Sequence, residues 1–207
     1  AAAALRTSAP ATLLALDRAV SLDDFANLAR GHASVWQAGA FRRPPGLSRR
    51  ERIEVVVMAA GGGIATASLK AELQAYLLAR AQPGLAISVV DYTPLSFQLA
   101  VTVRVRSESF DPETVASGVV AALQSAFSAS ARRLGQPLYR GEVYRVVDGV
   151  QGVENSDCRI VLPPATEGAL QRVSLTFGEV AAAWPREGQC LLLAAVPPTV
   201  LVQEYAL

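Results

Sequence analysis

Residues 95–106 carry the pattern that most constrains how this chain can fold. Apolar side chains occupy alternate positions along the stretch, at Phe97, Leu99, Val101, Val103 and Val105. Polar side chains stand between most of them, so one face of the strand is apolar and the other polar. This period is typical of an antiparallel sheet covered on one side, because strands of doubly wound parallel sheets are apolar on both faces.

Two further segments have the period of amphipathic helices. The stripes are Leu69, Leu73, Tyr76 and Leu77 in the first segment and Val115, Val119, Leu123 and Phe127 in the second. Asp111 stands where a capping side chain is needed at the start of the second helix, and Pro112 suits the first helical position. We expect these helices to cover an apolar sheet face.

The order of the expected elements indicates a fold. From Arg52 to Leu162 they read strand, helix, strand, strand, helix, strand, with a short helix inserted late, which is the split βαβ or ferredoxin-like order. The segment 91–95 is either a turn between two strands or a bend within one long strand. The sequence predicts an α+β fold in three parts: an N-terminal helix-strand segment and basic loop (1–50), a ferredoxin-like domain with an antiparallel sheet and helices on one face (51–163), and a strand-rich arm (164–207).

Near the N-terminus, charged residues mark the start of another helix. Ser21 and Asp24 are spaced so that each side chain can accept a hydrogen bond from the other residue's backbone N–H. Val20 and Phe25 are expected to pack together beside this cap, and Gly31 to end the helix in the left-handed conformation. Acidic residues in a first turn are also favoured by the helix dipole. The cluster therefore indicates a helix start rather than catalytic carboxylates.

Composition excludes several classes of partner. The 207 residues contain 19 Lys and Arg against 18 Asp and Glu, so a net charge of +1 gives no long-range attraction to nucleic acid or an anionic membrane. No apolar run approaches the roughly 20 residues that cross a bilayer, and residues 1–12 do not resemble a signal peptide. Cys158 and Cys190 lie far apart without CxxC spacing, which favours reduced thiols. We expect a soluble chain with no nucleic-acid partner and no membrane insertion.

No reaction centre is recognisable in the sequence. His32 is the only histidine and follows a helix end, whereas a nucleophile–His pair needs a third positioned group. The glycines at 61–63 fit no phosphate-loop spacing, and GxSxG and HExxH do not occur. Glu142 and Asp148 flank a short helical segment, where a solvated face explains them. We expect a protein that is not an enzyme, with no catalytic residue, cofactor or metal.

Two segments are candidates for contacts with other proteins. Residues 42–52 contain five arginines but no aromatic side chain for base stacking, so a protein contact is favoured over nucleic acid. The C-terminal strands can pair with the edge of a neighbouring chain. The candidate interface residues are Arg42, Arg43, Arg49 and Arg50 in the loop and Val200, Val202 and Tyr205 in the tail.

The ordered motifs of residues 13–162 resemble the C-terminal part of baseplate J-like proteins, which are wedge components of contractile phage tails and related injection systems. RAVSLDDFANLAR matches the family's R-x-V-[ST]-x-x-D-[FY]-x-x-x-A helix at Arg18, Val20, Ser21, Asp24, Phe25 and Ala29. LYRGEVYRVVDGVQGV matches its late helix and Gly-Val turn at Val143, Val147, Gly152 and Val153. LTFGEVAAAWPREGQCLLLAAV is similar to the family's closing strands.

This resemblance implies a structural wedge subunit that links the central hub and spike to the sheath through protein contacts. In such wedges two copies join a smaller wedge protein, and six wedges surround the hub. The implied partners are a second copy, the smaller wedge protein, neighbouring wedges, hub, spike and sheath, in a particle assembled in the bacterial cytoplasm. The alternative is a ferredoxin-like module that binds RNA or a small regulatory ligand, with exposed aromatic side chains on its open sheet face.

Overall fold

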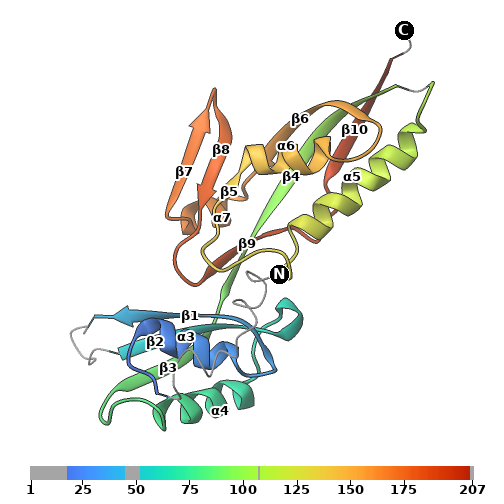
Figure 1. The fold of residues 1–207 in the computed structure, drawn as a ribbon. Helices are drawn as coiled ribbons and strands as arrows, with labels where there is room; N and C mark the ends of the chain where they lie inside the picture. Colours follow the sequence, from blue (N-terminus) through green and yellow to red (C-terminus); the bar gives the residue numbers. More distant parts are fainter. Residues whose placement is uncertain (1–17, 45–51, 107, 206–207) are drawn as a thin grey trace, which may run out of the picture. The chain divides into compact units, whose positions relative to one another are not determined.

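The computed structural model describes residues 18–44, 52–106 and 108–205. The chain divides between Thr93 and Pro94 into two compact units, which we call unit 1 and unit 2 (Figure 1). Helices and mixed sheets occur in both units, which confirms the α+β class.

Unit 1 is a three-stranded sheet with helices. Its elements are α3 (Leu22–Arg30), β1 (Val35–Arg43), β2 (Arg52–Ala59), the 3-10 turn η1 (Ala60–Gly62), α4 (Ala67–Leu78) and β3 (Ala86–Asp91). The strand order is β1-β2-β3, with β1 antiparallel and β3 parallel to the central β2. Because parallel neighbours need a crossover connection, α4 links β2 to β3.

One face of the unit 1 sheet packs against both helices. The buried cluster joins Phe25, Leu28 and Ala29 of α3, Leu73 and Leu77 of α4, and Ile53, Val55, Val57, Ile87 and Val89 of the sheet. Alternate residues of β2 therefore face the helices, which is the period expected for residues 52–59. The stripe expected in α4 is confirmed at its two buried leucines.

The predicted cap of α3 is present. The backbone N–H of Asp24 donates to Ser21 Oγ at 3.2 Å, and that of Ser21 donates to Asp24 Oδ2 at 2.8 Å. The second of these bonds lowers the pKa of Asp24. The packing of Val20 on Phe25 is wrong: Val20 is 80% exposed, and Ala19 is buried in its place. Gly31 is also right-handed, with φ −68°, because the chain continues into a further turn at the helix end.

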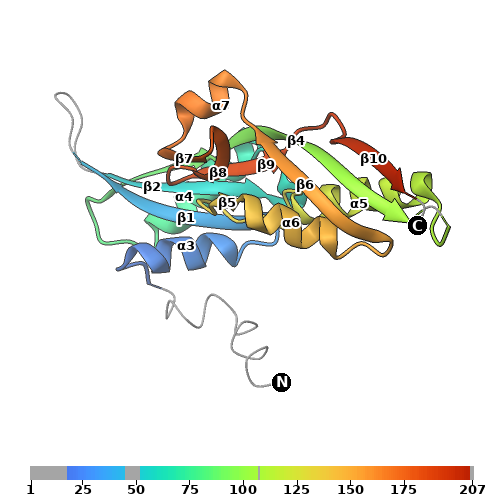
Figure 2. The same cartoon turned by 90° about the horizontal axis from the view of Figure 1, so that it is seen from above.

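Unit 2 contains a main sheet, a small sheet and three helices. Its elements are β4 (Thr93–Arg106), α5 (Pro112–Ala126), β5 (Leu138–Tyr139), α6 (Arg140–Asp148), β6 (Val153–Val161), α7 (Pro164–Ala169), β7 (Arg172–Thr176), β8 (Glu179–Trp184), β9 (Gln189–Leu193) and β10 (Thr199–Tyr205). In the main sheet β4 lies between β6, which is antiparallel to it, and β10, which is parallel (Figure 2). β9 also pairs with β4, and the small sheet has the order β5-β8-β7.

The alternation in β4 is confirmed. Its apolar side chains, Leu95 to Val105 at every second position, are buried against the α5 stripe of Val115, Val119, Leu123 and Phe127 and against Val143 and Val147 of α6. Phe97 and Phe127 meet edge to face with ring centroids 5.6 Å apart. Each large apolar side chain that is fully buried stabilises the unit by about 1.5–3 kcal/mol.

The structure differs from the ferredoxin-like prediction in how the strands are grouped. The strands expected to form one sheet over residues 51–163 lie in two sheets, and the chain changes sheet inside the segment 91–95. The Asp91 carboxylate accepts hydrogen bonds from Ala65 N at 2.9 Å and Lys70 Nζ at 2.6 Å, which fixes the end of β3 within unit 1. β1, expected to lie outside the domain, completes the unit 1 sheet instead. The division of the chain therefore lies between Thr93 and Pro94 and not near residues 50 and 163.

Candidate interaction surfaces

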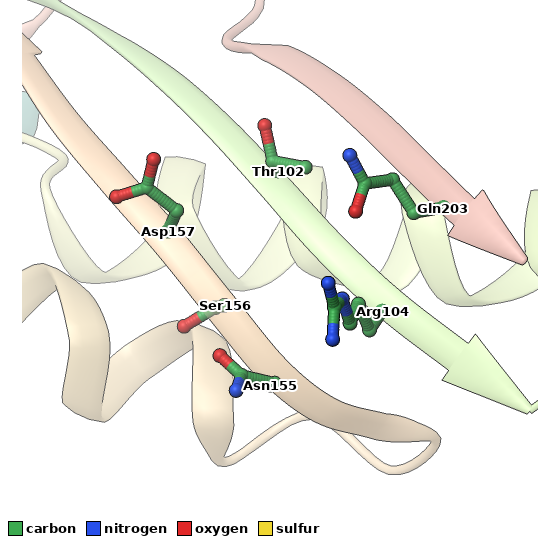
Figure 3. Close-up of a pocket in the computed structure, with 6 residues that line it drawn as sticks. All are labelled: Thr102, Arg104, Asn155, Ser156, Asp157 and Gln203. Atoms are coloured by element: carbon green, nitrogen blue, oxygen red, sulfur yellow. The ribbon is translucent and has the colours of Figure 1, made fainter. Parts of the chain in front are cut away.

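The polar face of the main sheet in unit 2 is the first candidate surface. The strand register places Thr102 beside Asp157 in one row, with the apolar Leu201 at its β10 end, and the polar residues Gln203, Arg104 and Asn155 in the next row. These rows border a hollow of about 380 Å³ (Figure 3). Because α5 and α6 pack on the opposite face, the hollow lies on the side of the sheet that these helices leave uncovered.

Arg104 is the distinctive cation of this polar face. It is exposed and makes no ion pair with any described residue, whereas its neighbours are paired. Arg106 contacts Glu154 at 2.9 Å, and Arg159 contacts Glu179 at 2.9 Å. The face combines this cation with the Asp157 carboxylate and amide groups, and its described side chains include no aromatic ring. These groups suit a polar protein contact better than base stacking.

The arginine loop is partly described. Arg43 donates from Nε and Nη2 to Glu54 Oε1 at 2.9 and 2.7 Å, so its charge is balanced within the β1–β2 pair. Arg42 precedes it in β1 and is exposed. Arg49 and Arg50 lie outside the described residues. Arg43 is therefore held by its own sheet, and a partner contact by the loop stays a prediction.

The C-terminal segment forms β10, the edge strand of the main sheet. Val200 and Val202 are partly buried and pack against the core of unit 2, while Leu201 between them is 61% exposed. Tyr205 pairs with Arg106 in the register, and its side chain is outside the described part. Among the described strands β10 has a neighbour on one side only, so its outer backbone edge has no strand partner there. Side chains alternate along a strand, so Leu201 points outward where Val200 and Val202 point inward. The interface prediction named Val200 and Val202 without using this alternation.

The groups considered for chemistry have local structural roles. His32 Nδ1 accepts from the backbone N–H of Ser34 at 3.2 Å, and its Nε2 lies 3.5 Å from Glu72. Asp148 is exposed, as expected, and accepts from a serine hydroxyl of β6, whereas Glu142 is partly buried and accepts from buried Arg132 at 3.0 Å. In the described ranges there is no group of three or more His, Cys, Asp or Glu that could hold a metal.

Cys158 and Cys190 are free, buried thiols. Burial raises the pKa of each from 9.0 to about 11. The folded chain therefore binds more protons than the unfolded chain between these values, and the thiols contribute stability below pH 9 that is lost as the pH rises towards 11. At neutral pH both side chains are protonated and poor nucleophiles.

These raised pKa values predict slow thiol chemistry. At pH 8 the thiolate fraction of each cysteine is about a hundredfold lower than in the unfolded chain, and burial blocks access as well. An aromatic disulfide reagent is therefore expected to react with both thiols rapidly in guanidinium chloride and very slowly under native conditions. Rapid labelling of one thiol in the native chain would contradict this assignment.

A membrane-spanning segment is not found among the helices of the described chain, none of which combines the needed length and apolar character.

A family model matches most of the described part of unit 1. Residues 17–90 match the family model of the Baseplate J-like central domain, and the match ends just before the boundary of unit 1. The resemblance to the baseplate J-like family is confirmed. The matched region is the central domain of this family, whereas the motifs had indicated its C-terminal part. No curated protein matches the chain.

A solved structure shares the fold of this chain. It is a chain in the cryo-EM structure of the anti-feeding prophage (AFP) baseplate, 6-fold symmetrised, with a TM-score of 0.63 and 13% sequence identity. The similarity covers 92% of this chain and 41% of that chain. The chain therefore spans less than half the length of this structural neighbour.

Proposed function

We propose that this chain is a structural subunit of the baseplate of a contractile injection system or contractile phage tail. The observation that carries the proposal is the match of residues 17–90 to the Baseplate J-like central domain, on a unit that the structure delimits independently. The fold shared with a chain of the AFP baseplate supports it across both units. The role is one of protein–protein contact and not of catalysis.

Within the baseplate the chain acts as a wedge component that links the central hub and spike to the sheath. Its partners are a second copy, a smaller wedge protein, neighbouring wedges, hub, spike and sheath, assembled in the bacterial cytoplasm. Each unit has its own buried core, which suits parts that keep their shape while an assembly changes state. The polar face, the arginine loop and the open edge of β10 supply separate docking surfaces.

The proposal predicts what accompanies the full-length protein when it is purified by affinity from its own cell. Mass spectrometry should find sheath, tube and a second wedge protein, and negative-stain images should show six-fold particles. A lone monomer that carries nucleic acid or a metabolite would contradict the proposal and favour a binding module.

The same purification tests the arginine loop. Charge reversal at Arg42, Arg49 and Arg50 is expected to reduce the recovery of complete particles, because these side chains are proposed to contact a partner. Arg43 stays unchanged, since it supports the β1–β2 pair through Glu54. The matched control is Arg133→Glu, which reverses the charge of an exposed arginine in unit 2. Equal recovery from both variants would remove the loop from the interface.

A further inference from the structure

The β7–β8 hairpin ends in a turn whose sequence does not suit its geometry. Thr176 pairs with Glu179, and the two residues between them, Phe177 and Gly178, have φ values of 52° and 78°. A two-residue loop with both φ values positive is a type I′ turn, which favours Asn-Gly or Asp-Gly. Phe177 is the one non-glycine residue with positive φ in the described chain. A bulky side chain in this conformation is strained.

Packing within the described chain does not compensate for this strain at Phe177. Its side chain is fully exposed, and Leu175 two residues earlier is 59% exposed. The segment 175–178 carries no charge, and the adjacent Glu179 is held by Arg140 at 2.6 Å and Arg159 at 2.9 Å. The hairpin tip is therefore an uncharged aromatic projection, the type of side chain that anchors protein interfaces.

A groove in the same unit has matching chemistry. A shallow hollow of about 410 Å³ lies between α5 and β10 and is lined largely by small and apolar side chains, including Ala116, Val120, Ala121, Pro198 and Val200. The 18 residues from 114 to 131 contain no charged side chain. The outer face of a surface helix ordinarily carries charges. The groove is thus a second surface suited to an apolar contact.

The hairpin and the groove lie on opposite sides of unit 2. β10 forms one edge of the main sheet, β6 lies beyond β4, and β8 packs beside β6 (Figures 1 and 2). The hairpin of one copy cannot fill the groove of that copy, because Phe177 is fully exposed there. A contact between two different patches of identical chains is head-to-tail, and repeated contacts of this type close into rings when the rotation permits.

We propose that Phe177 of one copy inserts into the groove between α5 and β10 of the next copy. Both surfaces are uncharged, one projects and the other is hollow, and their positions allow the contact to repeat from copy to copy. The contact specifies how copies of this chain would meet in the proposed baseplate. It rests on the proposed function only because that function provides a symmetric assembly. A lipid bilayer is less favoured as the partner of the aromatic tip, because the tip offers only two exposed apolar side chains, Leu175 and Phe177.

Cysteine cross-linking tests the contact while leaving Phe177 in place. Two variants of the 207-residue chain, Thr176→Cys and Gln124→Cys, place thiols beside the hairpin tip and on the groove rim. Mixing the two under mild oxidation is expected to give a disulfide-linked pair. The matched control replaces Gln124→Cys with Ala165→Cys, an exposed position on α7 that is not part of the groove. Equal cross-linking to both positions, or none to Gln124→Cys, would overturn the proposal.

Phe177→Asn separates docking from folding. Asparagine before glycine is favoured in a type I′ turn, so the melting temperature should stay the same or rise. In the Thr176→Cys background the same substitution should reduce the cross-linked product by at least about tenfold, as expected for an interface anchor. Unchanged cross-linking would contradict the proposal, as would Phe177-dependent binding to phospholipid vesicles in place of self-association. These experiments use the purified chain and not the particle. The cross-linking can therefore fail while the particle purification supports the baseplate role, and the cross-linking can succeed while the purification does not support that role.

Discussion

Replacing Arg132 with alanine is expected to lower the free energy of unfolding of unit 2 by about 3–5 kcal/mol. The Arg132 side chain is 1% exposed. It donates to Glu142 Oε2 at 3.0 Å and to the carbonyl oxygens of Gln136 and Pro137 at 3.0 and 2.8 Å. Its removal leaves the partly buried Glu142 carboxylate and two backbone carbonyl groups without these donors, which is costlier than the loss of a surface ion pair.

Arg133 provides the matched control for this experiment. Its side chain is exposed, so Arg133→Ala should change the free energy of unfolding by no more than about 0.5 kcal/mol. Denaturant unfolding followed by Trp184 fluorescence, in a Trp36→Phe background, reports on unit 2 alone. If Arg132→Ala lowers the free energy of unfolding by less than about 1 kcal/mol, the hydrogen bonds of the buried guanidinium do not stabilise unit 2 as expected.

Gly152→Ala is expected to lower the free energy of unfolding of unit 2 by about 2–5 kcal/mol, which is the second large effect predicted for this unit. Gly152 has φ +97°, which strains any residue with a Cβ. A Cβ there would also lie 2.7 Å from Val115 Cγ2 and 3.0 Å from the Phe110 ring, so α5 and the turn before β6 would have to separate. The turn that resembles the family's Gly-Val motif thus has a packing reason for its glycine.

A second glycine separates these two causes. Gly135 has φ +71° but nothing within 4 Å of a built Cβ, so Gly135→Ala measures the backbone strain alone. The two variants are compared by denaturant unfolding in the Trp184 reporter background. The loss in free energy of unfolding should be larger for Gly152→Ala than for Gly135→Ala by about 1–3 kcal/mol, which is the cost of overpacking. Equal losses would show that the close contact with Val115 is relieved without cost.

Local patterns predicted the elements of this fold well. The alternation of β4, the stripe of α5 and the capping box at Ser21 each depend on residues close in sequence, and each is confirmed. The division between Thr93 and Pro94 was missed, because periodicity shows which face of a strand is buried but not which strand lies beside it. The strand pairing shows this, because β2 pairs with β1 and β3, whereas β4 pairs with β6, β9 and β10 in another sheet.

The candidate surfaces were predictable only in part. The arginine loop and the C-terminal strand follow from composition, but the inward direction of Val200 and Val202 depends on the pairing of β10 with β4. The burial of Arg132 has no sequence signal, since neighbouring Arg133 is exposed. The turn at Phe177 had no such signal, because two-residue turns are indicated by pairs such as Asn-Gly, Asp-Gly or Gly-Gly and not by Phe-Gly.

The most direct test of a baseplate role is the position of the chain in an assembled particle. Cryo-electron microscopy of particles purified from the source cell, with a compact tag at the C-terminus, would locate each copy. The account predicts that the folds of units 1 and 2 fit density around the central spike, repeated with six-fold symmetry at the end of the sheath. Tag density elsewhere on the particle, or particles without the chain, would contradict it.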